Sequence, residues 1–296
     1  MTLYTHQTSN VRKTWFLMTG FFIVVVAIGW VFAQVWADSS ILYIAIIFSI
    51  LMNFFSYWYS DKIVVKMSGA KPANREEFFD LWTSVENLSI TAGLPMPKVY
   101  VINDSAPNAF ATGRNAEHAV VAVTMGLLSV LNKTELEGVI AHELSHIGNK
   151  DMLLSTVAVV LVGFVSILSD IFLRSGLRNG GGGRDRGKAG GVIMIVGLVL
   201  AILAPIVATL IHLAISRKRE FLADASGALL TRYPEGLASA LQKISEYGAP
   251  MQKASNATAH LFIANPFGSK AGVISKMFMT HPPVGDRINA LLGHPR

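Results

Sequence analysis

The hydrophobic positions of the chain are concentrated in four long runs that polar segments separate. The runs cover roughly residues 15–36, 41–59, 152–172 and 192–215, and each can cross a bilayer core as a helix of about 20 residues. Tryptophan and tyrosine gather toward the ends of the first two runs, as interfacial anchors do. The pattern therefore predicts two transmembrane helical hairpins. The first run is too long for a cleaved signal segment.

The polar segments carry the patterns of a folded domain. Residues 75–91 have the period of an amphipathic helix, residues 98–103 and 119–124 are rich in β-branched side chains typical of strands, and residues 286–292 predict a short helix. We therefore predict four parts. They are an N-terminal transmembrane hairpin (1–60), the first half of a polar domain (61–151), a second hydrophobic hairpin with a Gly- and Arg-rich loop (152–215), and the second half of the domain (216–296).

The composition agrees with a membrane protein. Hydrophobic residues make up 52% of the 296 positions and charged residues only 15%, whereas a soluble domain carries about a quarter charged residues. The absence of cysteine excludes disulfides, thiolate metal ligands and a cysteine nucleophile. The net charge of +6 fits contact with anionic lipid. No basic module interleaved with aromatic residues is present, so a nucleic-acid partner is not expected.

The basic residues predict the orientation of the hairpins. Arg12 and Lys13 precede the first run and four further basic residues follow the second, so both ends of that hairpin are predicted to be cytoplasmic. The loop at residues 174–191 conflicts with this orientation because it has five basic residues, against ten on the predicted inner side. We predict a multi-pass membrane protein whose polar domain faces the cytoplasm.

The candidate chemistry begins with a His-Glu-x-x-His motif, His142, Glu143 and His146. Helical residues four apart share a face, so two imidazoles can bind one Zn²⁺ while Glu143 takes a proton from the bound water. Thr134 and Glu137 have the spacing of a capping box, which predicts the start of this helix. The alternative is a chance match on a surface helix.

The third ligand is predicted beyond the second hairpin. The metzincin continuation is absent, since Asn149 and Met152 replace its glycine and histidine. Glu220 is the candidate ligand, and Asp224, one turn later, can orient a ligand histidine. If the helices that carry His146 and Glu220 run antiparallel, their turn falls midway, in a run of four glycines. The alternative for Glu220 is a solvated charge on a helix.

The motifs HELSH and EFLAD, with PNAFATG before them and THPP near the end, resemble the HtpX heat-shock membrane proteases. These are bacterial relatives of the CaaX prenyl endopeptidases, with a gluzincin-type site, and the resemblance covers nearly the whole chain. It implies His142, His146 and Glu220 as zinc ligands and Glu143 as general base. The predicted fold is thus mainly α, with two transmembrane hairpins and an α+β zincin-like catalytic domain that contains a small sheet.

Three further residues are candidates for substrate binding or control. Asn108 lies in a segment that can form an extended edge near the zinc helix, where it either contacts the substrate backbone or is a turn residue. His281 either stabilises the oxyanion, gates the metal, or is a loop histidine. Arg287 either pairs with Asp224 or another carboxylate, or caps a surface helix; the sequence slightly favours the surface.

The predicted function is a zinc metalloendopeptidase that removes misfolded or damaged membrane proteins, with one Zn²⁺ per chain. Its expected partners are unfolded membrane-protein segments, the lipid bilayer and other quality-control proteases. The alternatives are an inactive or gated scaffold or chaperone of the same fold, and a CaaX-type prenyl-protein endopeptidase. An intramembrane protease is disfavoured because polar and charged residues flank the motif.

Overall fold

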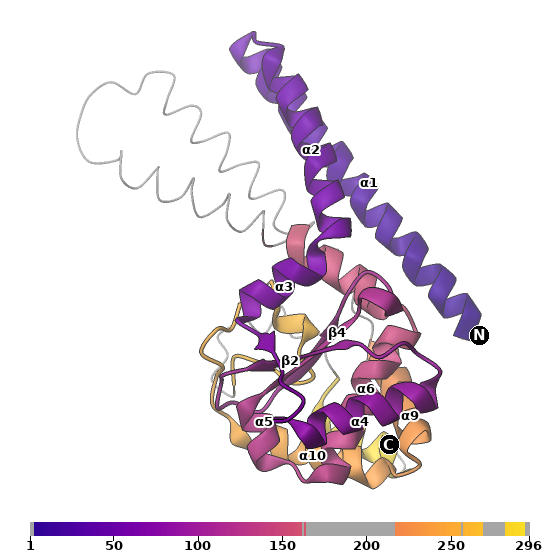
Figure 1. Ribbon diagram of the computed structural model, residues 1–296. Coiled ribbons are helices and arrows are strands. Elements are labelled where there is room, and N and C mark those ends of the chain that lie inside the picture. The colour runs from indigo at the N-terminus through magenta and orange to yellow at the C-terminus, as the bar shows by residue number, and fades with distance from the viewer. Residues whose placement is uncertain (1–2, 162, 164–216, 256, 269–281, 294–296) are drawn as a thin grey trace.

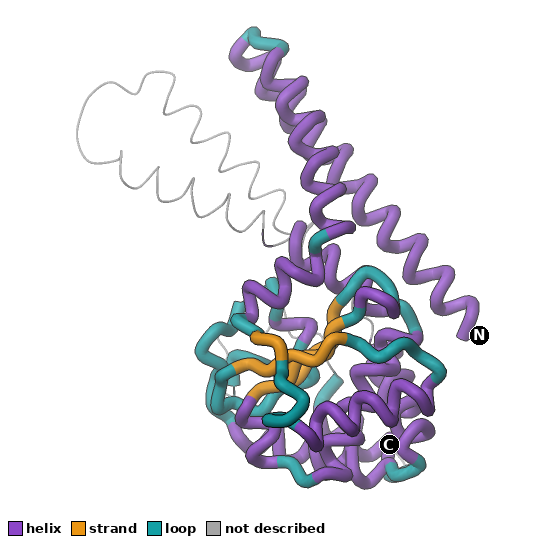
Figure 2. The backbone as a smooth tube through the Cα atoms, in the orientation of Figure 1, coloured by secondary structure: helices purple, strands orange, loops and turns teal. Residues whose placement is uncertain are grey.

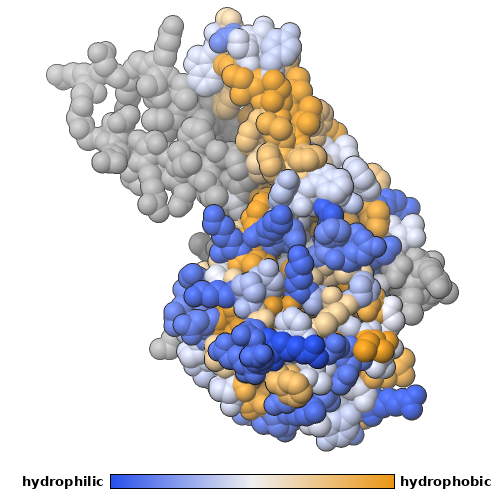
Figure 3. Space-filling view, in the orientation of Figure 1, coloured by the Kyte–Doolittle hydropathy of each residue, from blue (hydrophilic) through white to orange (hydrophobic). Residues whose placement is uncertain are grey.

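The first two helices form a hairpin whose closed end projects from the domain, while the N-terminal end of its first helix lies beside the domain (Figure 1). The computed structural model describes residues 3–161, 163, 217–255, 257–268 and 282–293. The hairpin consists of α1 (Leu3–Trp36) and α2 (Ser40–Trp58). Both helices are long and apolar enough to cross a membrane, and their apolar side chains are exposed, such as Phe16 at 70% and Ile44 at 65%. Figure 3 shows this apolar surface on the hairpin, in contrast to the mixed surface of the domain. The predicted N-terminal hairpin is thus confirmed as a helical pair.

A small mixed sheet lies at the centre of the domain (Figure 2). Its strands are β1 (Lys71–Pro72), β2 (Lys98–Ile102), β3 (Ala109–Thr112) and β4 (Val120–Thr124). The strand order is β1-β2-β4-β3, with β2 and β4 parallel and the other pairs antiparallel. The two longer strands confirm the prediction, while β1 and β3 are too short to give a periodic pattern.

Both faces of the sheet are buried, which explains why β4 is apolar at every position but its last. Val121 and Val123 pack into a core with helices on one face, whereas Ala122 packs on the other face with Phe110 and Phe262. Successive side chains of a strand point to opposite faces, so a strand covered on both sides needs apolar residues throughout. The sheet is therefore an internal scaffold for the helices around it.

The motif helix α6 (Lys133–Gly148) begins earlier than the sequence predicted. Its N-cap is Asn132, whose side chain accepts from the Glu135 N–H at 3.0 Å, while the Glu135 carboxylate accepts from the Asn132 N–H at 2.9 Å. The predicted capping box of Thr134 and Glu137 is therefore wrong by two residues. The extended backbone of Asn132 makes it the residue that can cap, and Thr134 instead donates to the Asn132 side chain.

The third hydrophobic run begins as part of the protein core. α6 ends at Gly148, Lys150 has a positive φ of 56°, and a new helix covers Asp151–Leu161. Its apolar side chains, such as Val157 and Ala158, are completely buried against the sheet and α1. The remainder of the predicted second hairpin lies outside the described residues, apart from residue 163. The described part of the chain contains two candidate membrane spans, and the four-span topology stays a prediction.

The remaining helices surround the sheet and α6. They are α3 (Ser60–Ser68), α4 (Phe79–Ala92), α5 (Met125–Val130), α9 (Arg217–Thr231), α10 (Pro234–Tyr247), α12 (Val284–Leu291) and the short turns Ala116–His118 and Ala259–Leu261. α4 starts later than predicted because residues 75–78 form turns. One hydrophobic cluster contains side chains from α4, α6 and α10, so the two halves of the polar domain share a core.

Candidate metal centre

Helices α6 and α9 bring the motif residues together. Glu220, near the start of α9, faces His146, near the end of α6. Gly227, further along α9, lies against the backbone of His142, which comes earlier in α6. The two helices therefore run antiparallel, as the sequence predicted. His142 and Glu220 are buried, at 1% and 5% exposure.

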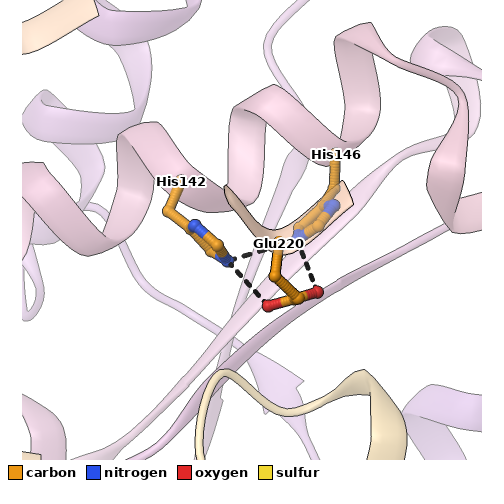
Figure 4. Close-up of side chains that lie close together, drawn as sticks. All are labelled: His142, His146 and Glu220. Atoms are coloured by element: carbon orange, nitrogen blue, oxygen red, sulfur yellow. Dashed lines mark hydrogen bonds and ion pairs between the residues drawn. The ribbon is translucent and has the colours of Figure 1, made fainter. Parts of the chain in front are cut away.

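Three side chains point toward one another in the way that a metal ion requires (Figure 4). The Nε2 atoms of His142 and His146 are 3.2 Å apart, and the Glu220 carboxylate oxygens lie 3.9 and 3.7 Å from them. Tetrahedral bonds of about 2.1 Å separate neighbouring ligand atoms by about 3.4 Å. All three ligand atoms lie within 4.8 Å of one another, so the group fits a zinc-sized cation after small adjustments.

Each of the two histidines has a carboxylate next to its Nδ1 atom, on the side of the ring away from the other ligand atoms. The Nδ1 atom of His142 is 2.9 Å from Asp224, as the sequence predicted, and the Nδ1 atom of His146 is 3.3 Å from Asp151. Such partners fix the tautomer, so that Nε2 faces the metal. The sequence analysis did not predict the contact between Asp151 and His146. An acidic residue shortly after the motif helix does not by itself indicate which side chain it will contact.

The two imidazoles have opposite electrostatic surroundings. Burial lowers the pKa of His142 to about 4, although the Asp224 carboxylate opposes it. Burial also lowers the pKa of His146, but the carboxylates of Asp151 and Glu220 outweigh burial and raise it to about 9. Only a neutral imidazole binds a metal, so a cation has to displace the proton that His146 holds at neutral pH.

Glu143 lies in the wall of the same pocket, beside both histidines. Burial raises its pKa to about 7, and the Ala111 backbone of β3 hydrogen-bonds to its carboxylate. Its Oε1 atom is buried and has no hydrogen-bond partner among the described residues. A buried carboxyl oxygen left open beside a cluster of ligands is placed to accept a proton from a bound water.

Arg287 is part of this centre. It is 1% exposed, and its guanidinium donates to the two Asp224 oxygens at 2.8 and 2.6 Å and to the Ile263 carbonyl at 3.1 Å. The favoured surface position was therefore wrong, and the alternative of a pair with Asp224 is what the structure contains. The guanidinium holds the orienting carboxylate of His142 in place.

Asn108 uses its side chain within the protein. Its amide donates to the Ala264 carbonyl at 3.0 Å and accepts from the Ala264 N–H at 3.2 Å. The neighbouring Ala109 carbonyl accepts from Ile263 at 2.9 Å, which covers the start of the β3 edge. β3 is an edge strand, as expected for the extended segment. His281 lies outside the described residues.

Gly227 permits the close approach of α9 to α6, and its replacement tests the geometry. A Cβ atom at this position would lie 2.9 Å from the His142 backbone nitrogen and 3.2 Å from the Ala141 carbonyl carbon. Gly227→Ala is expected to move α9, with Glu220, away from α6, to abolish stoichiometric metal binding and to cost about 1–3 kcal/mol of stability. Metal content and thermal unfolding in chelator measure the two effects. Gly285→Ala is the control, because among the described residues its Cβ meets nothing within 4 Å. Equal metal content in both variants would contradict the prediction.

Comparisons with known proteins identify the family of the chain. A sequence model of peptidase family M48 matches residues 76–294. Similar proteins include protease HtpX homologs from Caldanaerobacter subterraneus subsp. tengcongensis, 48% identical over 295 residues (98% of this chain, 97% of that protein), and from Dictyoglomus turgidum, 46% identical over 291 residues (98% and 94%). The crystal structure of S. mikatae Ste24p has a similar fold, with a TM-score of 0.51 at 19% identity over 97% of this chain and 67% of that one.

An apolar helical hairpin joined to a domain with a buried His-His-Glu cluster defines the class, which is a membrane metalloprotease. The chain belongs to peptidase family M48, and the identity over nearly its whole length confirms the resemblance to HtpX proteases. Membership of this family implies a metal cofactor.

Proposed function

We propose that this protease is a zinc endopeptidase of the bacterial inner membrane that cleaves unfolded or damaged membrane-protein segments on the cytoplasmic side. The observation that carries the proposal is the convergence of His142, His146 and Glu220 at distances that suit one Zn²⁺, with an open oxygen of Glu143 beside them. A His₂Glu set with a free fourth position is the ligand arrangement of hydrolytic zinc sites.

The chain's own residues supply the proton transfers and the orientation. A bound zinc ion would polarise the scissile carbonyl and lower the pKa of its water. Glu143, with a pKa of about 7, accepts the proton of the attacking water and returns it to the leaving amine. Asp224 and Asp151 hold the two imidazoles. His281, which lies outside the described residues, is proposed as the oxyanion donor or as a gate.

The location of the centre supports membrane-protein substrates. The pocket is lined by Asp151 and Met152, at the start of the helix that packs against α1, so an unfolded segment that leaves the bilayer can reach it. The basic residues around the first hairpin support a cytoplasmic position. A multi-pass arrangement with two hairpins, and association with other quality-control proteases, remain parts of the proposal.

Neither alternative function has an observation in its favour. An inactive scaffold has no need of the two carboxylates behind the histidines or of Glu143, and the presence of all three beside the candidate ligands supports an active protease. A CaaX-type endopeptidase requires a site for a prenyl group, and no feature of the described residues indicates one.

Removal of the carboxylate ligand tests the proposal. Full-length protein is purified in detergent, stripped with chelator and reloaded with zinc. Wild type is expected to hold one zinc and to cleave an unfolded casein-like substrate, whereas Glu220→Ala holds none, because two imidazoles alone bind too weakly. Glu235→Ala, in the first turn of α10, is the control and should match wild type. A wild type without stoichiometric metal would overturn the zinc assignment.

A further inference from the structure

Asn10 joins the first membrane helix to the metal centre. α1 has 34 residues and α2 only 19, so at about 1.5 Å per residue α1 extends roughly 20 Å beyond its partner. In Figure 1 the N-terminal end of α1 lies beside the domain. Asn10 is 3% exposed. Its amide donates to the Asp151 carboxylate at 2.5 Å and to the Asn149 carbonyl at 3.2 Å, and accepts from Arg219 at 3.2 Å.

Asp151 transmits this contact to the candidate zinc ligand. One of its oxygens binds Asn10 and lies 3.8 Å from Arg219, while the other faces the Nδ1 atom of His146 at 3.3 Å. Asp151 and Arg219 are 4% and 8% exposed. A buried carboxylate needs donors on its free lone pairs to stay in one orientation. Asn10 is such a donor, and it comes from a membrane helix.

We propose that Asn10, Asp151 and Arg219 form a positioning network through which α1 fixes the ring orientation of His146 for zinc. The proposal rests on the proposed function, since it assumes that His146 binds the metal. Asp151 holds the Nδ1–H of His146, so that Nε2 points at the ion. Asn10 and Arg219 prevent the carboxylate from turning away. The membrane hairpin is then a component of the metal centre as well as an anchor.

The test measures zinc affinity of the full-length protein in detergent by competition with a chromophoric chelator. Asp151→Asn keeps the shape of the side chain, but its single carbonyl oxygen cannot serve both His146 and Asn10, so affinity should fall about 10- to 100-fold. Asn10→Ala is expected to weaken zinc binding by about 10-fold, the lower end of that range, because it acts through Asp151.

Thr14 supplies the matched control. It lies one turn further along α1, is 2% exposed, and its hydroxyl donates to the Asn10 carbonyl within the helix. Thr14→Ala perturbs the packing of α1 without touching Asp151, so its zinc affinity should equal that of wild type. In the double variant Asn10→Ala/Asp151→Asn, the loss of Asn10 should not weaken zinc binding further than Asp151→Asn alone. Asn10 acts on His146 only through the Asp151 carboxylate, which this variant already lacks.

A second measurement separates positioning from general stability. Zinc raises the unfolding temperature by an amount that depends on its affinity, so the rise from chelator to zinc should be smaller in the network variants than in wild type and in Thr14→Ala. This difference is independent of any fall in the unfolding temperature in chelator that a buried group without its partner causes. If Asn10→Ala does not fold, Asn10→Ser is measured in its place with the same expectation. Wild-type affinity in Asn10→Ala and Asp151→Asn would overturn the network alone. A wild type that binds no zinc would overturn the proposed function with it.

Discussion

Glu143→Gln is expected to abolish measurable proteolysis while leaving the metal in place. Glutamine has the size and shape of glutamate but cannot accept a proton, and general base catalysis contributes about 10²- to 10⁴-fold to such reactions. The three candidate ligands are unchanged, so zinc content should stay at one per chain. Turnover of an unfolded casein-like substrate and metal content on the same preparation give both results.

Glu137→Gln is the matched control for this prediction, because it removes a carboxylate from the same helix six residues earlier than Glu143 and is partly exposed. It should keep wild-type turnover. Activity in Glu143→Gln within about tenfold of wild type would remove this residue as the base, since that is less than general base catalysis contributes. Loss of zinc in the same variant would show instead that the glutamate supports metal binding.

The cluster of candidate ligands was predictable because its signals are short-range or geometric. His142 and His146 share a helix face by spacing alone, and Glu220 follows from the requirement that two ligands lie at equal depth on antiparallel helices. That arrangement of α6 and α9 is present in the structure. Long apolar runs likewise gave the N-terminal hairpin, since bilayer thickness fixes the length of a spanning helix.

Asp224 was predicted, but the positions of Asp151 and Arg287 were not, because they depend on tertiary packing. Arg287 is 63 residues from the Asp224 that it binds, and a short amphipathic helix with an arginine is typical of a surface. Asp151 gains its role from the break between α6 and the next helix, at the positive φ of Lys150. The same break directs the start of the third hydrophobic run into the core.

The residues around position 150 connect the candidate metal centre with the apolar helix that packs against α1. The motif helix, the carboxylate that orients His146 and the first residues of an apolar helix follow one another directly. A protease built this way holds its centre against the base of the hairpin. In the proposed arrangement this places the centre near the membrane surface, where the proposed class of substrate would leave the bilayer.

Arg287→Met is expected to lower the free energy of unfolding by about 3–5 kcal/mol, because it leaves the Asp224 charge buried without its partner. Burial raises the pKa of Asp224, but the hydrogen bonds from Arg287 and His142 outweigh burial and hold the pKa below its ordinary value. In wild type this group therefore contributes stability above about pH 4 that is lost as pH falls through its lowered pKa. Without Arg287 the pKa rises, and the carboxyl can protonate to escape the penalty.

The loss of stability in Arg287→Met should consequently be larger at pH 8 than at pH 5, where the unpaired carboxyl is closer to protonation. Unfolding of the full chain in detergent, with chelator present so that metal affinity does not contribute, measures it at both values. Arg287→Met/Asp224→Asn is the control: removal of both charges should recover part of the stability, since a buried pair costs most when one partner is left alone. A single variant within about 1 kcal/mol of wild type at pH 8 would show that Asp224 finds another donor, and that Arg287 does not hold it.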